Sequence, residues 1–177
     1  KINALKEKRC ISVTGIINAD VDSLTFTDSL EEALSDVRLI MVSITTNNIA
    51  KLAINIAPFI NPSQIFVLNP GHTFGALEFV YTLKANGVQE LPIVAETQDL
   101  IFVSKLDKDY NLKIIGIKKQ MDIASYNPKD INEVMGNKGV DFDKKLSDYI
   151  TKLDDYLIFI IIDKSNNMGQ STNIYKT

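Results

Sequence analysis

The middle of the chain alternates between short apolar runs and amphipathic stretches. Residues 38–44, 65–68 and 91–95 have the length and composition of strands that are buried on both faces of a parallel sheet. Between these runs, apolar residues recur every three or four positions over 49–56 and 76–83, which predicts two helices. The order strand, helix, strand, helix, strand predicts a parallel sheet with right-handed crossover connections.

Shorter patterns flank this unit. Residues 11–15 and 24–27 are expected to form strands, and Asp28 is expected to cap a short helix that follows. Residues 100–104 and 112–117 predict two strands joined by a polar turn, and hence a hairpin beside the parallel sheet. The predicted fold class is α/β, an incomplete Rossmann-like parallel sheet with flanking helices and an added β-hairpin.

The pattern weakens beyond residue 125. Residues 144–156 have helical spacing, 157–162 are apolar and rich in β-formers, and 163–177 are polar and expected to be disordered. We therefore expect a partial dinucleotide-binding domain over 1–125, without its Gly-rich first strand turn. Residues 126–177 are expected to be a diverged or truncated C-terminal segment that is partly disordered.

Composition narrows the classes of function. The chain has 177 residues, of which 45% are apolar and 23% charged, and this fits one ordinary globular domain. Its net charge of -3 argues against nucleic acid as a partner. One cysteine, Cys10, and one histidine, His72, exclude a disulfide framework and a zinc cluster of such ligands. No apolar run approaches the roughly 20 residues of a membrane helix, so we expect no membrane contact and a cytoplasmic location. Because the sequence begins at Lys1, we expect a trimmed start or a fragment.

Candidate chemistry lies where the predicted strands end. Ligands of open parallel sheets bind beyond the carboxyl ends of the strands, and segments 43–46, 69–73 and 96–98 follow three predicted strands. Each segment also has a structural interpretation. Asn-Pro-Gly is common turn chemistry, in which proline fixes φ and Gly71 accepts a positive φ. Glu96 is more informative because a partly buried carboxylate needs a donor, although it would also suit the cap of a turn.

Other reactive residues carry little signal. His72 is interpreted as a partly solvated turn residue, since the sequence places no carboxylate beside it. Cys10 is interpreted as a structural thiol. The sequence contains no G-x-G-x-x-G turn, so pyrophosphate has no cradle on a first helix, and by spacing the strand before that turn would precede Lys1. We assign no catalytic residue and no metal ligand.

Three motifs of the sequence are specific enough in combination to resemble a known family. Residues 68–79 (LNPGHTFGALEF), 94–98 (VAETQ) and 115–119 (IGIKK) resemble the octopine/nopaline (opine) dehydrogenase family, and 33–42 looks like the strand entering that family's cofactor loop. The likeness covers residues 24–125. It implies NAD(P)H-dependent reductive condensation of an amino acid with a 2-oxo acid, often pyruvate. It also implies a Rossmann domain followed by a helical domain that supplies a catalytic histidine. The preference between NAD and NADP is not readable.

The resemblance implies roles for three loops. Residues 43–46 line the nicotinamide-ribose side of the cofactor, and residues 69–71 form the next loop around it. Residues 96 and 97 face the nicotinamide and the oxo acid. The implied cofactor-binding residues are Ser43, Ile44, Thr45, Thr46, Asn69, Pro70, Gly71 and Glu96, and the implied substrate-binding residue is Thr97.

Departures from the family shape the functional prediction. The histidine-bearing helix has no counterpart after Tyr126, so we expect an oxidoreductase-type domain that is inactive as this fragment. Two alternatives stay open. One is a related oxo-acid reductase of the ketopantoate or glycerol-3-phosphate dehydrogenase type. The other is a non-catalytic binding or assembly module, in which an exposed apolar sheet edge would favour homo-oligomers.

Overall fold

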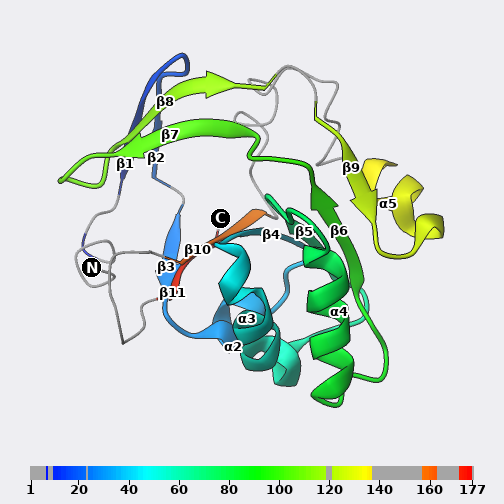
Figure 1. The fold of residues 1–177 in the computed structure, drawn as a ribbon. Helices are drawn as coiled ribbons and strands as arrows, with labels where there is room; N and C mark the ends of the chain where they lie inside the picture. Colours follow the sequence, from blue (N-terminus) through cyan, green and yellow to red (C-terminus); the bar gives the residue numbers. More distant parts are fainter. Residues whose placement is uncertain are drawn as a thin grey trace.

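Two β-sheets and a small set of helices make up the fold (Figure 1). The structure is a computed structural model that describes residues 7, 10–22, 24–118, 121–136, 157–162 and 172–176. The strands are β1 (Ile11–Gly15), β2 (Ala19–Val21), β3 (Thr25–Thr27), β4 (Leu39–Ser43), β5 (Ile65–Leu68), β6 (Ile93–Thr97), β7 (Phe102–Leu106), β8 (Leu112–Ile117), β9 (Ile123–Ser125), β10 (Leu157–Ile162) and β11 (Thr172–Lys176). The helices are α2 (Leu30–Leu34), α3 (Ile49–Ile56), α4 (Gly75–Ala85) and α5 (Ile131–Gly136), with short 3-10 turns η1 (Thr46–Asn48), η2 (Ala57–Phe59) and η3 (Pro128–Asp130).

The larger sheet is built around a parallel unit. Over the described residues its seven strands have the order β3-β11-β10-β4-β5-β6-β9. Strands β10, β4, β5 and β6 run parallel, whereas β11 and β9 run antiparallel to their neighbours. Helices α3 and α4 lie together on one face of this sheet (Figure 1). The predicted strand, helix, strand, helix, strand unit is therefore present, and the α/β fold class is confirmed.

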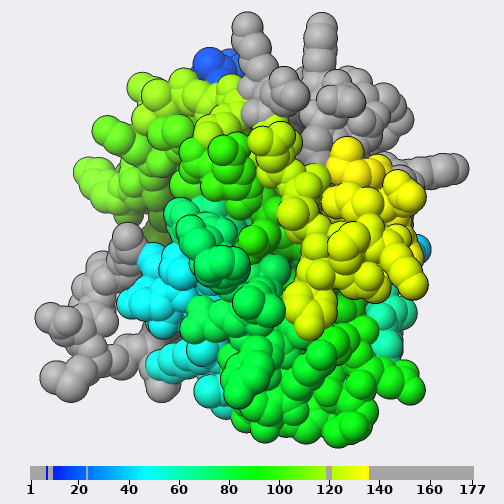
Figure 2. Space-filling model, turned by 45° about the vertical axis from the view of Figure 1, so that its right-hand side comes forward, coloured from blue at the N-terminus to red at the C-terminus, as the bar shows by residue number. Residues whose placement is uncertain are grey.

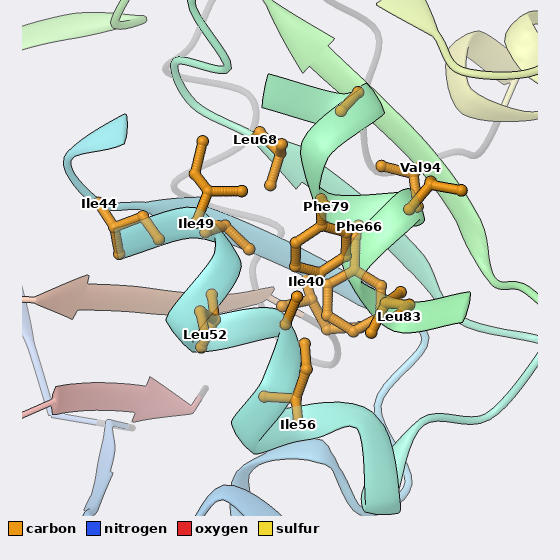
Figure 3. Close-up of a cluster of buried hydrophobic side chains, with 14 of the residues drawn as sticks. Ile40, Ile44, Ile49, Leu52, Ile56, Phe66, Leu68, Phe79, Leu83 and Val94 are labelled. Atoms are coloured by element: carbon orange, nitrogen blue, oxygen red, sulfur yellow. The ribbon is translucent and has the colours of Figure 1, made fainter. Parts of the chain in front are cut away.

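Burial on both faces explains why the central strands form. All four residues of β5 are at most 1% exposed, as expected of an apolar run without alternation. On the helical face, Phe66 of β5 packs against Phe79 of α4 with ring centroids 5.4 Å apart (Figure 3). On the opposite face, Val67 and Ala95 pack with Val134 of α5. The sheet is thus the middle layer of a three-layer core.

The predicted hairpin belongs to a second sheet. Strands β7 and β8 pair antiparallel as expected, but β8 also pairs in parallel with β1, giving the order β2-β1-β8-β7. Ile114 of β8 packs with Ile11, Val13 and Phe26 in a separate apolar cluster. The hairpin is therefore not part of the parallel sheet, and the edge of the larger sheet beside β6 is occupied by β9. The β9–α5 segment lies at the surface of the molecule (Figure 2), and the Lys84 ammonium of α4 lies 5.7 Å from the centroid of the Tyr126 ring.

Two local predictions are corrected. The N-cap of α2 is Ser29 rather than Asp28, because the Ser29 hydroxyl accepts the Glu32 N–H at 3.2 Å. Strand β6 begins two residues later than expected, at Ile93 instead of 91. Glu96 and Thr97 therefore lie inside the strand, where β9 pairs with them, and not in the loop that follows.

The C-terminal part of the chain enters the centre of the sheet. β10 pairs in parallel with β4, so the chain itself closes the side of β4 that faces away from β5. β11 forms within the tail that was expected to be disordered, and it joins β10 to β3. The predicted helix over 144–156 lies outside the described residues. None of the described helices has the length and apolar character required to cross a bilayer.

A buried amide fixes the entry to β5. Gln64 is 3% exposed, and its Nε2 donates to the carbonyl oxygens of Leu34 at 2.8 Å and Val37 at 3.1 Å. Its Oε1 accepts the Asn61 N–H at 3.0 Å. These bonds join the end of α2 to the turn before β5, and they satisfy two carbonyl groups that would otherwise be buried without a donor.

We expect Gln64→Leu to lower the free energy of unfolding by about 2 kcal/mol, because it strands these backbone groups without a partner. Urea unfolding followed by circular dichroism measures this change. Gln89→Leu, at an exposed position, is the matched control and is expected to change stability little. Equal stability of the two variants would show that the Gln64 amide is not a structural clamp.

Candidate functional site

The ends of three parallel strands meet at one edge of the larger sheet. The register pairs Val42 with Leu68 and Leu68 with Glu96, so β4, β5 and β6 end at nearly the same level. The Asn69 N–H donates to the Val42 carbonyl at 2.7 Å, and the Gly71 N–H donates to the Thr97 carbonyl at 3.2 Å. The sequence-predicted segments after these strands are therefore neighbours.

Glu96 ties this edge to a helix. Its Oε2 accepts the Ala76 N–H at 2.7 Å, in the first turn of α4. The N-cap residue of α4 is Phe74, which has a left-handed backbone and offers no side-chain acceptor. Strand β6 thus supplies the acceptor, and its negative charge lies at the positive end of the helix dipole. Glu96 does act as a cap, but for a helix twenty residues earlier in the chain.

Two glycines make room for the Glu96 carboxylate. A Cβ at Gly71 would lie 2.3 Å from Glu96 Cβ and 2.5 Å from its Oε2. A Cβ at Gly75 would lie 3.3 Å from the same oxygen. The sequence suggested a positive φ for Gly71, but the left-handed residues of this loop are His72 (φ 56) and Phe74 (φ 63). Gly71 is needed for space and not for its backbone angle.

Thr97 and Asn69 form a buried polar pair. Thr97 is 0% and Asn69 2% exposed. The Thr97 hydroxyl lies 2.9 Å from the Asp99 carbonyl and 3.2 Å from Asn69 Oδ1, and its one proton is shared between such acceptors. Asn69 Oδ1 also accepts the Ile101 N–H at 3.3 Å. Because neighbouring residues of a strand point to opposite faces, Thr97 and Glu96 leave β6 in opposite directions. A direct contact between Thr97 and a substrate stays a prediction.

The segment after β4 is more accessible. Ile44 is buried, while Ser43, Thr45 and Thr46 are half-buried. The Thr45 hydroxyl is already engaged with the side chains of Asn47 and Asn48, at 2.6 and 2.9 Å. After β5, Pro70 is buried and follows Asn69 through a cis peptide bond.

Three polar groups at this edge remain uncommitted. Across the part of the chain that the structure describes, the hydroxyls of Ser43 and Thr46 and the Oε1 atom of Glu96 make no hydrogen bond. All three residues are half-buried. Among the sequence-predicted residues, these are the side-chain groups best placed to hold a ligand.

The sequence did not reveal the role of Asp99, a charged residue beside the site. Asp99 Oδ2 forms an ion pair with the Lys118 ammonium at the end of β8, and Oδ1 accepts the Leu100 N–H at 2.7 Å. The Lys118 hydrogen bond and the Leu100 N–H together hold the pKa of the Asp99 carboxyl below its ordinary value, and the charge of His72 adds to this effect. Among the described residues, no three acidic, histidine or cysteine side chains are grouped as metal ligands.

Comparisons with known proteins agree with the resemblance. No protein-family model matches the chain. Over 98 residues, or 55% of the chain, the sequence is 35% identical to an opine dehydrogenase of Arthrobacter sp. (strain 1C). The fold is similar to apo yersinopine dehydrogenase, with a TM-score of 0.60 and 14% identity over 76% of this chain. It is also similar to octopine dehydrogenase in a structure described as a complex with NADH and pyruvate, with a TM-score of 0.56 and 11% identity over 73% of this chain.

These comparisons confirm the likeness to opine dehydrogenases and the Rossmann-like fold class. The matches cover only part of the relatives. The chain spans 27% of the Arthrobacter protein, and 35% and 36% of the two solved chains.

We expect Gly71→Ala to lower the free energy of unfolding by about 2 kcal/mol, because the new methyl group overlaps Glu96 and overpacks the strand edge. Gly116→Ala in β8 is the matched control, since a Cβ there meets nothing within 4 Å. Thermal or urea unfolding of both variants measures the difference. A Gly71→Ala protein as stable as Gly116→Ala would contradict the close packing around Glu96.

The lowered pKa of Asp99 gives a second prediction. Since the pKa is lower in the folded than in the unfolded chain, ionised Asp99 stabilises the fold above about pH 3.8, and this contribution is lost as the pH falls through the folded value. We expect Lys118→Met to raise the Asp99 pKa towards 3.8, as seen in an NMR titration of the side-chain carboxyl carbon. Lys113→Met, at an exposed position of β8, should leave it unchanged. An identical pKa in both variants would refute the assigned cause.

Proposed function

We propose that the chain is the cofactor-binding part of an opine-dehydrogenase-type oxidoreductase and binds NAD or NADP at the carboxyl edge of β4, β5 and β6. The observation that carries the proposal is the convergence of three loops at this edge, where open parallel sheets bind nucleotides. Two further observations support it. The sequence is 35% identical to an opine dehydrogenase over 98 residues, and the yersinopine dehydrogenase fold to which the chain is similar has also been solved with NADP+.

The residues present fit such a ligand. A nicotinamide riboside moiety carries hydroxyl groups, which both donate and accept hydrogen bonds. The hydroxyls of Ser43 and Thr46 and the free oxygen of Glu96 offer uncommitted partners for them. When bound, the nicotinamide exchanges a hydride with the substrate. The contribution of this chain is to hold that ring and its ribose beside the strand ends.

The substrates are proposed to be an amino acid and a 2-oxo acid such as pyruvate, joined by reductive condensation. In support, structures of octopine dehydrogenase, whose fold is similar, are described as complexes with L-arginine and with pyruvate. Thr97, the predicted substrate residue, would act from the interior by fixing the Asn69 amide and the Asp99 carbonyl beneath the site. The unpaired Cys10 suits a reducing, cytoplasmic setting.

We also propose that this chain has no turnover by itself. The resemblance implies a catalytic histidine from a helical domain, whereas the single histidine of this sequence, His72, is exposed in the loop before α4. The chain also spans about a third of the similar solved enzymes. A site completed by residues beyond this span agrees with both facts.

Cofactor binding is tested by titrating NADH and NADPH into the chain with fluorescence detection and calorimetry. We expect saturable binding of at least one of them. Thr46→Val should weaken it about fivefold, since it removes one hydrogen bond. Thr82→Val in α4, away from this edge, should not change it. Binding of neither nucleotide would overturn the proposal, and a monodisperse oligomer without nucleotide affinity would favour the assembly module.

Turnover is measured as NADH and NADPH oxidation with pyruvate and a panel of amino acids. We expect none for this chain, with a full-length opine dehydrogenase as the positive control of the assay. Turnover by this chain would refute the proposed inactivity while leaving the reaction class intact.

A further inference from the structure

We propose that Glu96 determines which part of a ligand binds at this end of the site. Its carboxylate takes the anion position at the N-terminus of α4. That end therefore excludes phosphate and accepts a group that donates hydrogen bonds. The exclusion of phosphate follows from the geometry alone, whereas the identity of the donor group rests on the proposed function.

The N-terminus of α4 has the features of an anion site. The helix has 11 residues and follows directly on a strand and a glycine-containing loop at the carboxyl edge of a parallel sheet. Its N-cap side chain accepts no hydrogen bond from the first turn, so the N–H groups of that turn need an acceptor from elsewhere, at the positive end of the helix dipole. In α/β folds this is the usual place for a ligand phosphate.

Here the anion belongs to the protein. Glu96 Oε2 lies 2.7 Å from the Ala76 nitrogen, the distance of a charge-assisted hydrogen bond. The carboxylate also fills the space that Gly71 and Gly75 leave open, since Cβ atoms there would approach Oε2 to 2.5 and 3.3 Å. A phosphate would find this volume occupied, and it would meet a like charge at contact distance.

The second carboxylate oxygen defines what can bind instead. Glu96 Oε1 has no hydrogen-bond partner among the described residues, and Glu96 is half-buried. An ionised carboxylate only accepts hydrogen bonds. It therefore selects a hydroxyl or an ammonium group. Under the proposed function these belong to the nicotinamide ribose or to the amino acid substrate, and the cofactor phosphates lie away from α4.

The exclusion is tested by thermal unfolding with inorganic phosphate, against sodium chloride at equal ionic strength. We expect ~20 mM phosphate to leave the wild-type Tm unchanged and to raise that of Glu96→Ala by about 3 °C, because the freed N–H groups bind the anion. Glu96→Ser is the second variant should Glu96→Ala fail to fold. Glu78→Ala, which removes an exposed acid from the same first turn, controls for loss of charge and should show no phosphate response.

If phosphate stabilises only the Glu96 variants, the result supports the Glu96 carboxylate as the anion at the N-terminus of α4. If phosphate stabilises the wild-type protein equally, or stabilises no variant, the proposal is overturned. This readout needs no dinucleotide, so its failure is separable from failure of the proposed function.

The donor group is identified by calorimetry with nicotinamide riboside and with L-alanine as separate probes. We expect Glu96→Gln, which keeps an oxygen for the Ala76 N–H but loses the charge, to weaken the binding of nicotinamide riboside or of L-alanine about tenfold. The probe that responds identifies the group as a ribose hydroxyl or as an ammonium. Unchanged binding of both probes in Glu96→Gln would overturn the donor assignment, and so would wild-type protein that binds neither.

Discussion

The arrangement of the site depends on one constraint, the in-register parallel pairing of β4, β5 and β6. Parallel hydrogen bonds fix the relative height of neighbouring strands, and here they align Val42, Leu68 and Glu96. Because every one of these strands is buried on both faces, a slip by one residue would exchange its two faces, so the register is strongly specified. Chain segments separated by more than fifty residues are thereby brought to the same edge.

A second layer of contacts turns that edge into a defined surface. The Glu96 carboxylate joins β6 to the start of α4, and the buried Thr97 hydroxyl joins the carboxyl ends of β5 and β6. The Lys118 N–H donates to the Ile101 carbonyl at 3.0 Å, and the Lys118 side chain pairs with Asp99, which ties the second sheet to the same edge. The accessible groups of the site thus stand on a framework of buried polar bonds, which is the usual requirement for a precise binding surface.

Much of this was readable from the sequence, for identifiable reasons. Apolar runs without alternation and amphipathic spacing gave the three strands and two helices, because burial on both faces leaves such a pattern. The space required around Gly71 was not readable, since it depends on a side chain 25 positions later. The opposite orientation of Glu96 and Thr97 was missed because the end of β6 was placed two residues too early. The Asp99–Lys118 ion pair joins two sheets, and no local pattern reports such a contact.

The position of β10 has a consequence for how the chain assembles. β4 pairs with β5 through a local crossover, but its other neighbour arrives more than a hundred residues later in the sequence. Closing so long a loop costs conformational entropy before any contact repays it, and high contact order slows folding. During synthesis, β4, β5 and β6 leave the ribosome well before β10, so for that interval the middle of the sheet is an edge. Until β10 is synthesised and pairs with β4, that edge of the nascent chain is open to pairing with another molecule.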